Sequence, residues 1–351
     1  MFFCSAIALA LCLLLTPVII ALCKRFNWYD EIDPRKVHEG AVPRLGGIGI
    51  FVSFVFSAFI YIRFISDYDF RFAIPAFVAG LIIFVFGILD DFLNLRAKLK
   101  FLVQIVAALV VVCSPLYFKS FLGINLNPIV GRGLTFIWIL FLVNAYNLID
   151  GLDLLCGGLS FLTLLVAGIC MIRLGQPLGE LFVILCAAIL GFLFFNKPKA
   201  KIFLGDGGSQ SLGFAIALIP VIPMTGGFEH VKLLYALLLV SIPVTDVIAA
   251  VIRRTREHRS FFSADRGHIH HKLVNIGFTK VSAVVILLLF QFFIDIAAFA
   301  TIFMARTIDS VILLCVSIIL VWSFFITLHY VNRAVNNKHL GHLSEAPQEE
   351  H

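Results

Sequence analysis

FFCSAIALALCLLLTPVIIALC, residues 2–23, contains no charged side chain and is long enough to cross the hydrocarbon core of a membrane as one helix. No basic residue precedes this run, and it continues unbroken to Lys24. We therefore expect a retained span and not a cleaved signal peptide. The rest of the chain has the same character, because 61% of its 351 residues are hydrophobic and only 14% are charged. A water-soluble domain needs far more charge to cover its surface, so the composition indicates a membrane protein.

The sequence predicts an all-α polytopic membrane protein with about 11 transmembrane helices, since each span needs roughly 20 apolar residues. The apolar stretches cover residues 2–23, 46–62, 72–89, 101–118, 133–149, 154–172, 178–195, 208–223, 231–252, 281–304 and 308–330. Residues 1–332 are expected to form a single integral-membrane domain. Residues 333–351 are polar, contain Pro347 and three glutamates, and are expected to form a cytoplasmic tail.

The distribution of lysine and arginine predicts how the chain is oriented. With about eleven spans, the connecting segments alternate between two sides of the membrane. The loops at 24–45, 90–100, 150–153, 196–207 and 253–280, together with the tail, carry 20 of the 27 basic residues. Positively charged loops stay in the cytoplasm, so we predict an N-terminus on the outer, periplasmic side and a cytoplasmic C-terminus.

Two acidic motifs lie where predicted spans end on the cytoplasmic side. Asp90 and Asp91 are adjacent, so their carboxylates repel each other unless a cation lies nearby. Such a pair suits a Mg²⁺ ligand or a base for a phosphate proton, and the alternative is a helix end stopped by charge. Asn147, Asp150 and Asp153 recur every three residues, which on a helix would place each one turn above the last. Here the alternative is a set of hydrogen bonds between helices.

A glycine-rich motif and a histidine motif occupy two further cytoplasmic positions. In LGDGGSQS, residues 204–211, glycines allow close approach of the backbone, and Asp206 could bind a metal beside a diphosphate; an ordinary glycine turn is the alternative. Arg253 begins a basic run that is followed by His268-Ile269-His270-His271. These histidines could ligate Zn²⁺, but the carboxylates elsewhere are typical of Mg²⁺ sites, so we favour phosphate binding.

Together these motifs indicate phosphoryl transfer, in which positioning and charge neutralisation do most of the work. GxxxxGK[ST], GxGxxG and HExxH are all absent from the sequence. A transporter would place its charges at mid-span, often in repeated halves, and an intramembrane aspartyl protease would leave the basic loop unexplained. A CDP-alcohol phosphotransferase would need a DGxxAR run, which is missing. Asp246, in the ninth stretch, is expected to face the same cavity, whereas Asp295 has no assigned role.

Five segments resemble the polyprenyl-phosphate N-acetylhexosamine-1-phosphate transferases in order and spacing. They are DPRKVHEGAVPRLGG (33–47), DDFLN (90–94), NAYNLIDGLDLLCGG (144–158), LGDGGSQSLG (204–213) and DRGHIHHKL (265–273). In that family a UDP-N-acetylhexosamine donates its sugar-1-phosphate to a polyprenyl phosphate and releases UMP, with Mg²⁺ required and Mn²⁺ as a substitute. The resemblance implies a transferase domain over 1–332 in the bacterial inner membrane, a cytoplasmic active site, undecaprenyl phosphate as acceptor, no nucleic-acid partner, and a homodimer.

The histidine motif helps to choose a branch of that family. His268-Ile269-His270-His271 is similar to the GlcNAc-1-phosphate transferases that begin O-antigen, enterobacterial common antigen or teichoic acid linkage synthesis. The MurNAc-pentapeptide branch typically has three consecutive histidines. The resemblance therefore implies transfer from UDP-GlcNAc. UDP-linked FucNAc or QuiNAc, and UDP-MurNAc-pentapeptide, are the alternatives.

The resemblance also implies roles for individual residues. Asp206 would bind Mg²⁺, Asp90 would deprotonate the lipid phosphate, and Asp91 would lie beside the metal. Asp150 and Asp153, also counted as catalytic, would bind uridine or organise the metal site. The expected substrate-binding residues are Asn147, Arg254, Arg266, His268, His270, His271, Lys98, Lys100, Lys36 and Asn94. One departure is Leu154, where glycine would be commoner, which leaves the local turn uncertain.

Overall fold

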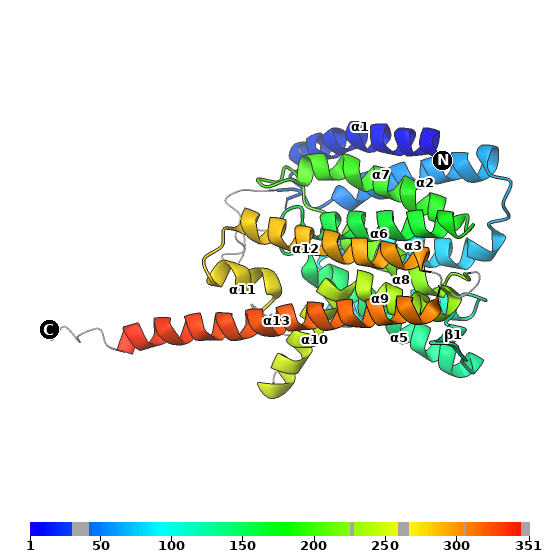
Figure 1. The fold of residues 1–351 in the computed structure, drawn as a ribbon. Helices are drawn as coiled ribbons and strands as arrows, with labels where there is room; N and C mark the ends of the chain where they lie inside the picture. Colours follow the sequence, from blue (N-terminus) through cyan, green and yellow to red (C-terminus); the bar gives the residue numbers. More distant parts are fainter. Residues whose placement is uncertain (30–41, 225–227, 259–266, 305, 345–351) are drawn as a thin grey trace.

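A computed structural model of the chain describes residues 1–351 except 30–41, 225–227, 259–266, 305 and 345–351. The described chain is almost entirely helical, and most of the helices run side by side (Figure 1). Eight helices in the described ranges are long and apolar enough to cross a membrane. They are α1 (Phe2–Phe26), α2 continued by η1 (Gly46–Ile60 and Tyr61–Ile65), η2 continued by α3 (Arg71–Ala73 and Ile74–Leu93), α5 (Pro128–Ile149), α6 (Leu155–Arg173), α7 (Leu178–Asn196), α12 continued by η4 (Lys280–Ala300 and Thr301–Phe303) and α13 (Thr307–Ser344).

The remaining helices explain the difference between eight and the predicted eleven. Both α4 (Ala97–Val112, 16 residues) and α8 (Gly205–Ala217, 13 residues) are shorter than an ordinary span. The stretch 231–252 is divided into α9 (Phe228–Leu239) and α10 (Ser241–Arg256), which meet at 66° and would make a ninth span if counted together. The helical membrane architecture is confirmed. The count of eleven and the orientation of the termini stay predictions.

The break between α9 and α10 exposes a backbone carbonyl that must find another partner. The Leu239 carbonyl accepts a hydrogen bond from Gln291 Nε2 of α12 at 2.9 Å and from Thr163 Oγ1 of α6 at 3.4 Å. Pro243 lies in the first turn of α10, where no intrahelical N–H bond is lost. The bend is therefore stabilised by polar side chains from two neighbouring spans.

The centre of the bundle is the short helix α8, which packs against α2, α3, α5 and α6. Nearly all of its residues are buried. The small elements lie at the periphery: α11 (Ile269–Asn275), η3 (Ile219–Val221) and a hairpin of β1 (Ser120–Phe121) and β2 (Ile124–Asn125), in which Ser120 pairs with Asn125. Because α8 is surrounded by other helices, the side chains on its first turn are contacted from several directions.

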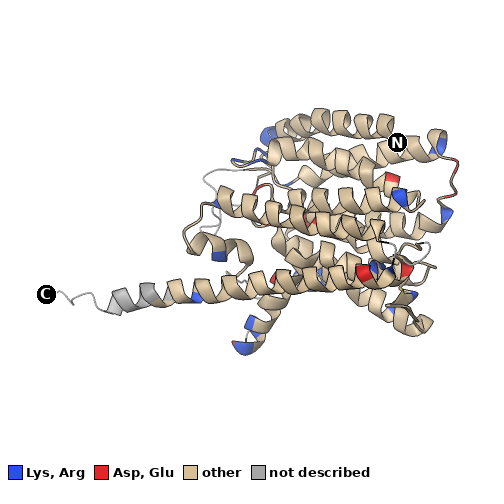
Figure 2. Ribbon diagram, in the orientation of Figure 1, with Lys and Arg blue, Asp and Glu red and all other residues tan. Residues whose placement is uncertain are grey.

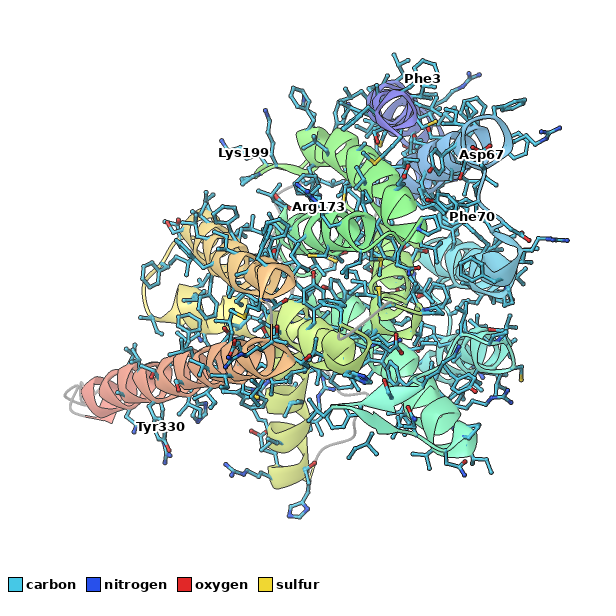
Figure 3. The ribbon with its side chains drawn as sticks, turned by 45° about the vertical axis from the view of Figure 1, so that its right-hand side comes forward. Phe3, Asp67, Phe70, Arg173, Lys199 and Tyr330 are labelled. Carbon is cyan, nitrogen blue, oxygen red and sulfur yellow. The ribbon has the colours of Figure 1, made fainter. Side chains whose placement is uncertain are left out.

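The outer helices present apolar side chains, as expected of surfaces that face lipid. Phe3 on α1 and Tyr330 on α13 are 67% and 63% exposed, and Figure 3 shows them pointing outward from opposite sides of the assembly. Most lysine, arginine, aspartate and glutamate residues lie at helix ends or in connections (Figure 2). The charged exceptions inside helices are consequently candidates for function.

Candidate active site

The first turn of α8 is fixed by the segment that leads into α2. Phe203 N–H donates to the Pro43 carbonyl at 2.7 Å, Gly46 N–H to the Phe203 carbonyl at 2.9 Å, and Gly47 N–H to the Leu204 carbonyl at 2.8 Å. Gly205 has a φ of +77°, and a Cβ there would collide with the Arg44 carbonyl. The glycine-rich motif thus begins α8, and two segments far apart in sequence meet there side by side.

Glycines also bring α3 against α8 at the level of the acidic motif. A Cβ at Gly87 would lie 2.5 Å from Gly207 Cα, so the two backbones are in direct contact. This approach places Asp91 at the N-terminus of α8, where Oδ1 accepts from Asp206 N–H at 2.8 Å and Oδ2 from Gly207 N–H at 3.0 Å. The first N–H groups of α8 are therefore capped by a carboxylate of the chain itself.

Lys100 on α4 lies between the other two carboxylates of this cluster. Its Nζ is 3.1 Å from Asp206 Oδ2 and also forms an ion pair with Asp90 Oδ2. Asp90 is only 3% exposed, and its Oδ1 accepts from Leu95 N–H at 2.8 Å. We call Asp90, Asp91, Asp206 and Lys100 the acidic cluster. Its single ammonium is shared by two acids.

A chain of amides lies beside the acidic cluster and joins α4, α5 and α8. Asn144 Nδ2 donates to Gln104 Oε1 at 2.7 Å, and Gln104 Nε2 donates to Gln210 Oε1 at 3.1 Å. Asn147 Oδ1 accepts from Ser209 Oγ at 2.9 Å. Gln104 was not predicted to belong to the site, because a single glutamine in an apolar stretch gives no local signal of a role.

The predicted helical stripe of Asn147, Asp150 and Asp153 is wrong, because α5 ends at Ile149. The next residues form a turn that ends at Leu154 with a φ of +71°. In this turn Asp153 Oδ2 accepts from Ala200 N–H at 3.1 Å. Asn196 on α7 binds the same region, since its Oδ1 accepts from Leu154 N–H at 2.9 Å and its Nδ2 donates to the Ile202 carbonyl at 2.9 Å. Asn196 is a second residue that the sequence did not reveal.

Asp150, at the end of α5, belongs electrostatically to the acidic cluster. Burial and the nearby Asp206 carboxylate together raise its pKa to about 7, although the Arg44 guanidinium opposes them. A carboxyl group with such a pKa is partly protonated near neutral pH. The 150–154 turn therefore adds a group that can hold or release a proton beside Asp206.

The histidine motif folds as the start of α11 and meets the 150–154 turn. The rings of His268 and His270 are nearly parallel with centroids 5.9 Å apart, and His271 is 4.3 Å from His270. A Cβ at Gly151 would lie 2.8 Å from Cε1 and Nε2 of His270, so that ring rests against the turn. Burial and the neighbouring His271 together lower the pKa of His270 to about 3, so this imidazole is neutral at pH 7.

Known proteins share this chain's motifs over most of its length. The profile described as glycosyl transferase family 4 matches residues 73–224. A Bacillus subtilis (strain 168) protein described as a probable undecaprenyl-phosphate N-acetylglucosaminyl 1-phosphate transferase is 32% identical over 323 residues, 89% of each chain. The chain belongs to glycosyl transferase family 4. Undecaprenyl-phosphate alpha-N-acetylglucosaminyl 1-phosphate transferases of Yersinia pestis and Escherichia coli (strain K12) are 33% and 30% identical to this family member. These two alignments cover 74% and 76% of this chain, and 73% and 75% of the relatives.

The structure brings together most, but not all, of the residues predicted for the site of this family 4 protein. The acidic cluster, Asn147, the 150–154 turn and the histidines adjoin one another, as described above. Arg254 is buried on α10. By contrast, Asn94 ends α3 in a left-handed conformation and is exposed, and Lys98 is also exposed. Lys36 and Arg266 lie outside the described residues.

The donor chemistry of the acidic cluster fits Mg²⁺ better than Zn²⁺. Within the described ranges, no group of three or more His, Cys, Asp or Glu side chains is arranged to hold a metal ion by itself. Asp90 and Asp206 instead share one cation, the Lys100 ammonium. Mg²⁺ is usually bound by one or two carboxylates together with substrate phosphates and water. In this family 4 chain, Asp206 therefore suits that ion, whereas both oxygens of Asp91 already cap α8.

Proposed function

We propose that the chain transfers GlcNAc-1-phosphate from UDP-GlcNAc to undecaprenyl phosphate, releasing UMP and forming undecaprenyl-diphosphate-GlcNAc. This would be the first membrane step of a cell-surface glycan. The observation that carries the proposal is the similarity to relatives described as GlcNAc-1-phosphate transferases, which extends over 89% of the chain in the Bacillus protein. The convergence of the acidic cluster, the 150–154 turn and the histidines supports it, because phosphoryl transfer needs several charges in one place.

In the proposed reaction, a phosphate oxygen of the acceptor lipid bonds to the sugar-bearing phosphorus of the donor. The bond between the two donor phosphates breaks, and its electron pair leaves with UMP. Asp90 takes the proton of the acceptor phosphate when that group arrives protonated, and Lys100 holds the carboxylates in place before substrate binds. Asp150, with its pKa near 7, keeps a second proton site beside Asp206.

We assign Mg²⁺, with Mn²⁺ as a substitute, to Asp206, and keep Asp90 as the base. When bound, the ion would neutralise charge on the diphosphate of the donor. Asp91 then has a positioning task, since its bonds to Asp206 N–H and Gly207 N–H fix the backbone from which the Asp206 side chain extends. The neutral His270 and its neighbours would bind the donor from the other side of the 150–154 turn.

The proposal includes the bacterial inner membrane, with the site open to the cytoplasm, and a homodimer. The supporting argument for the orientation is the concentration of 20 of 27 basic residues in one set of connections. A site at the ends of the spans also suits a reaction between a water-soluble donor and a lipid acceptor.

UMP release by the purified protein tests the function. The assay supplies undecaprenyl phosphate, Mg²⁺ and one UDP-sugar at a time: GlcNAc, FucNAc, QuiNAc or MurNAc-pentapeptide. We expect release with UDP-GlcNAc, abolished by EDTA, and regeneration of UDP-GlcNAc from the lipid product by excess UMP. Release with another sugar alone would change the substrate. No UMP release with any donor would support the transporter alternative. Transport across the membrane of proteoliposomes that contain the protein would then be measured.

A further inference from the structure

Asp246 is a buried carboxylate in an apolar helix and takes no part in the acidic cluster. It lies on α10, is 2% exposed, and directs both oxygens at the start of α11. Oδ2 is 2.8 Å from Nδ1 of His268, and Oδ1 accepts from Ile269 N–H at 2.7 Å. A buried carboxylate is costly unless it is fully paired, so this pairing is a specific feature of the fold.

We propose that Asp246 is the positioning residue of the histidine motif, and that it sets the tautomer of His268. A carboxylate only accepts hydrogen bonds, so Nδ1 of His268 must carry the proton between them. The second ring nitrogen, Nε2, is then unprotonated, so His268 presents it as an acceptor for a hydroxyl or phosphate proton. This inference rests on the proposed function and adds to it a residue that touches no substrate.

The hydrogen bond from Ile269 N–H to Asp246 also positions the remaining histidines. By accepting from Ile269 N–H, Asp246 caps the first turn of α11, which carries His270 and His271. His270 in turn rests against Gly151 of the 150–154 turn. One carboxylate on α10 thus fixes both the ring orientation of His268 and the placement of the helix that follows it.

Two substitutions of Asp246 separate the effect on the His268 tautomer from the effect on packing. In Asp246→Asn the amide oxygen can still accept from Ile269 N–H, but the amide nitrogen now donates to Nδ1 of His268. The proton of the neutral ring then moves to Nε2. Asp246→Glu keeps a carboxylate and should restore the original tautomer in part. Asp295→Asn is the matched control, because Asp295 is an equally buried acid bonded to Gln291 at 2.8 Å on α12.

The primary measurement is the ¹⁵N spectrum of protein labelled at histidine, with the His268 signal identified by its loss in His268→Gln. We expect wild type and Asp246→Glu to show a protonated Nδ1, and Asp246→Asn a protonated Nε2. With UDP-GlcNAc as donor, kcat should fall about 10²-fold or more in Asp246→Asn, recover at least tenfold in Asp246→Glu, and stay within about threefold in Asp295→Asn. KM should change less than kcat.

Two results would overturn the inference. One is an unchanged His268 tautomer in a folded Asp246→Asn protein. The other is a loss of activity in Asp246→Glu and Asp246→Asn alike that follows their loss of thermal stability, which would make Asp246 only a helix cap. The spectrum does not require turnover. Wild-type protein with the expected tautomer but no UMP release would therefore count against the proposed function and leave the positioning of His268 intact.

Discussion

The acidic cluster and the histidine motif are held in place by different kinds of contact. Around Asp206 the backbones of the long helix α3 and the short helix α8 touch, with a Cβ at Gly87 reaching within 2.5 Å of Gly207 Cα. The histidines instead lie at the start of a seven-residue helix whose first turn is capped by one side chain, Asp246. Backbone contacts resist any single side-chain change, whereas a side-chain bond is lost with one substitution. We therefore expect the acidic half to be rigid and the histidine half to be adjustable.

The largest effect is expected from Asp206→Asn, which keeps the size of the side chain but removes its charge. Turnover should fall roughly 10³-fold, because the carboxylate proposed to bind Mg²⁺ beside the donor diphosphate is lost. UMP release by purified protein measures this, and Asp309→Asn, an exposed acid at the start of α13, is the control. Wild-type activity in Asp206→Asn would contradict the assignment of the metal to this residue.

Two lysines of α4 offer a sharper test of the acidic cluster. Lys100→Gln should lower kcat about 10²-fold, since Asp90 and Asp206 lose the cation that they share. Lys98→Gln, on the same helix but exposed, should change kcat less than about twofold. Equal losses in both variants would mean that the charge of the helix, and not the position of Lys100, is what matters.

A methyl group at the helix contact tests whether backbone packing holds the acids. Gly87→Ala places Cβ against Gly207 Cα, which cannot move aside as a flexible side chain can, and should cost about 1–3 kcal/mol of stability. Gly80→Ala lies two turns earlier on α3, where Cβ would meet only the Phe214 ring at 3.4 Å, and should be nearly neutral. Thermal unfolding in detergent compares the two. Equal melting temperatures would show that the α3 and α8 contact yields easily.

The smallest effect concerns the pH dependence of stability. The pKa of Asp150 is about 7 in the folded chain but near 3.9 in an unfolded one. As the pH rises, the unfolded chain releases this proton at a lower pH than the folded chain does. The contribution of Asp150 to the free energy of unfolding is therefore complete below about pH 4 and is lost between about pH 4 and pH 7. Asp150→Asn cannot release a proton, and its stability relative to wild type should rise over that window. Parallel pH profiles for the two proteins would disprove the shifted pKa.

The spans could be predicted from the sequence because apolar length is a local property. Each of the predicted stretches overlaps helix in the structure. The break at Val240 was not predicted, although Pro243 lies just after it, because residues 231–252 are mostly apolar. The carbonyl left at the break is satisfied by Gln291, some fifty residues away. The lengths of α4 and α8 likewise depend on their neighbours and not on their own residues.

Much of the site could also be predicted, because acids and histidines at span ends are rare and conspicuous. The roles of the individual acids and histidines were harder to predict. Adjacent Asp90 and Asp91 look alike in sequence, yet one binds Lys100 and the other caps α8. The helical spacing of Asn147 and Asp150 was misleading because α5 ends between them. Such distinctions depend on contacts between distant segments, which a single sequence does not contain.

The pairing of residues 43–47 with 203–204 couples the position of the segment before α2 to the position of Asp206. Three backbone hydrogen bonds join the two segments, and the Arg44 carbonyl lies against Gly205. A shift of either segment would strain these hydrogen bonds, so residues 43–47 and the backbone that leads to Asp206 are expected to move together. A substitution that displaces residues 43–47 should therefore also displace the Asp206 carboxylate.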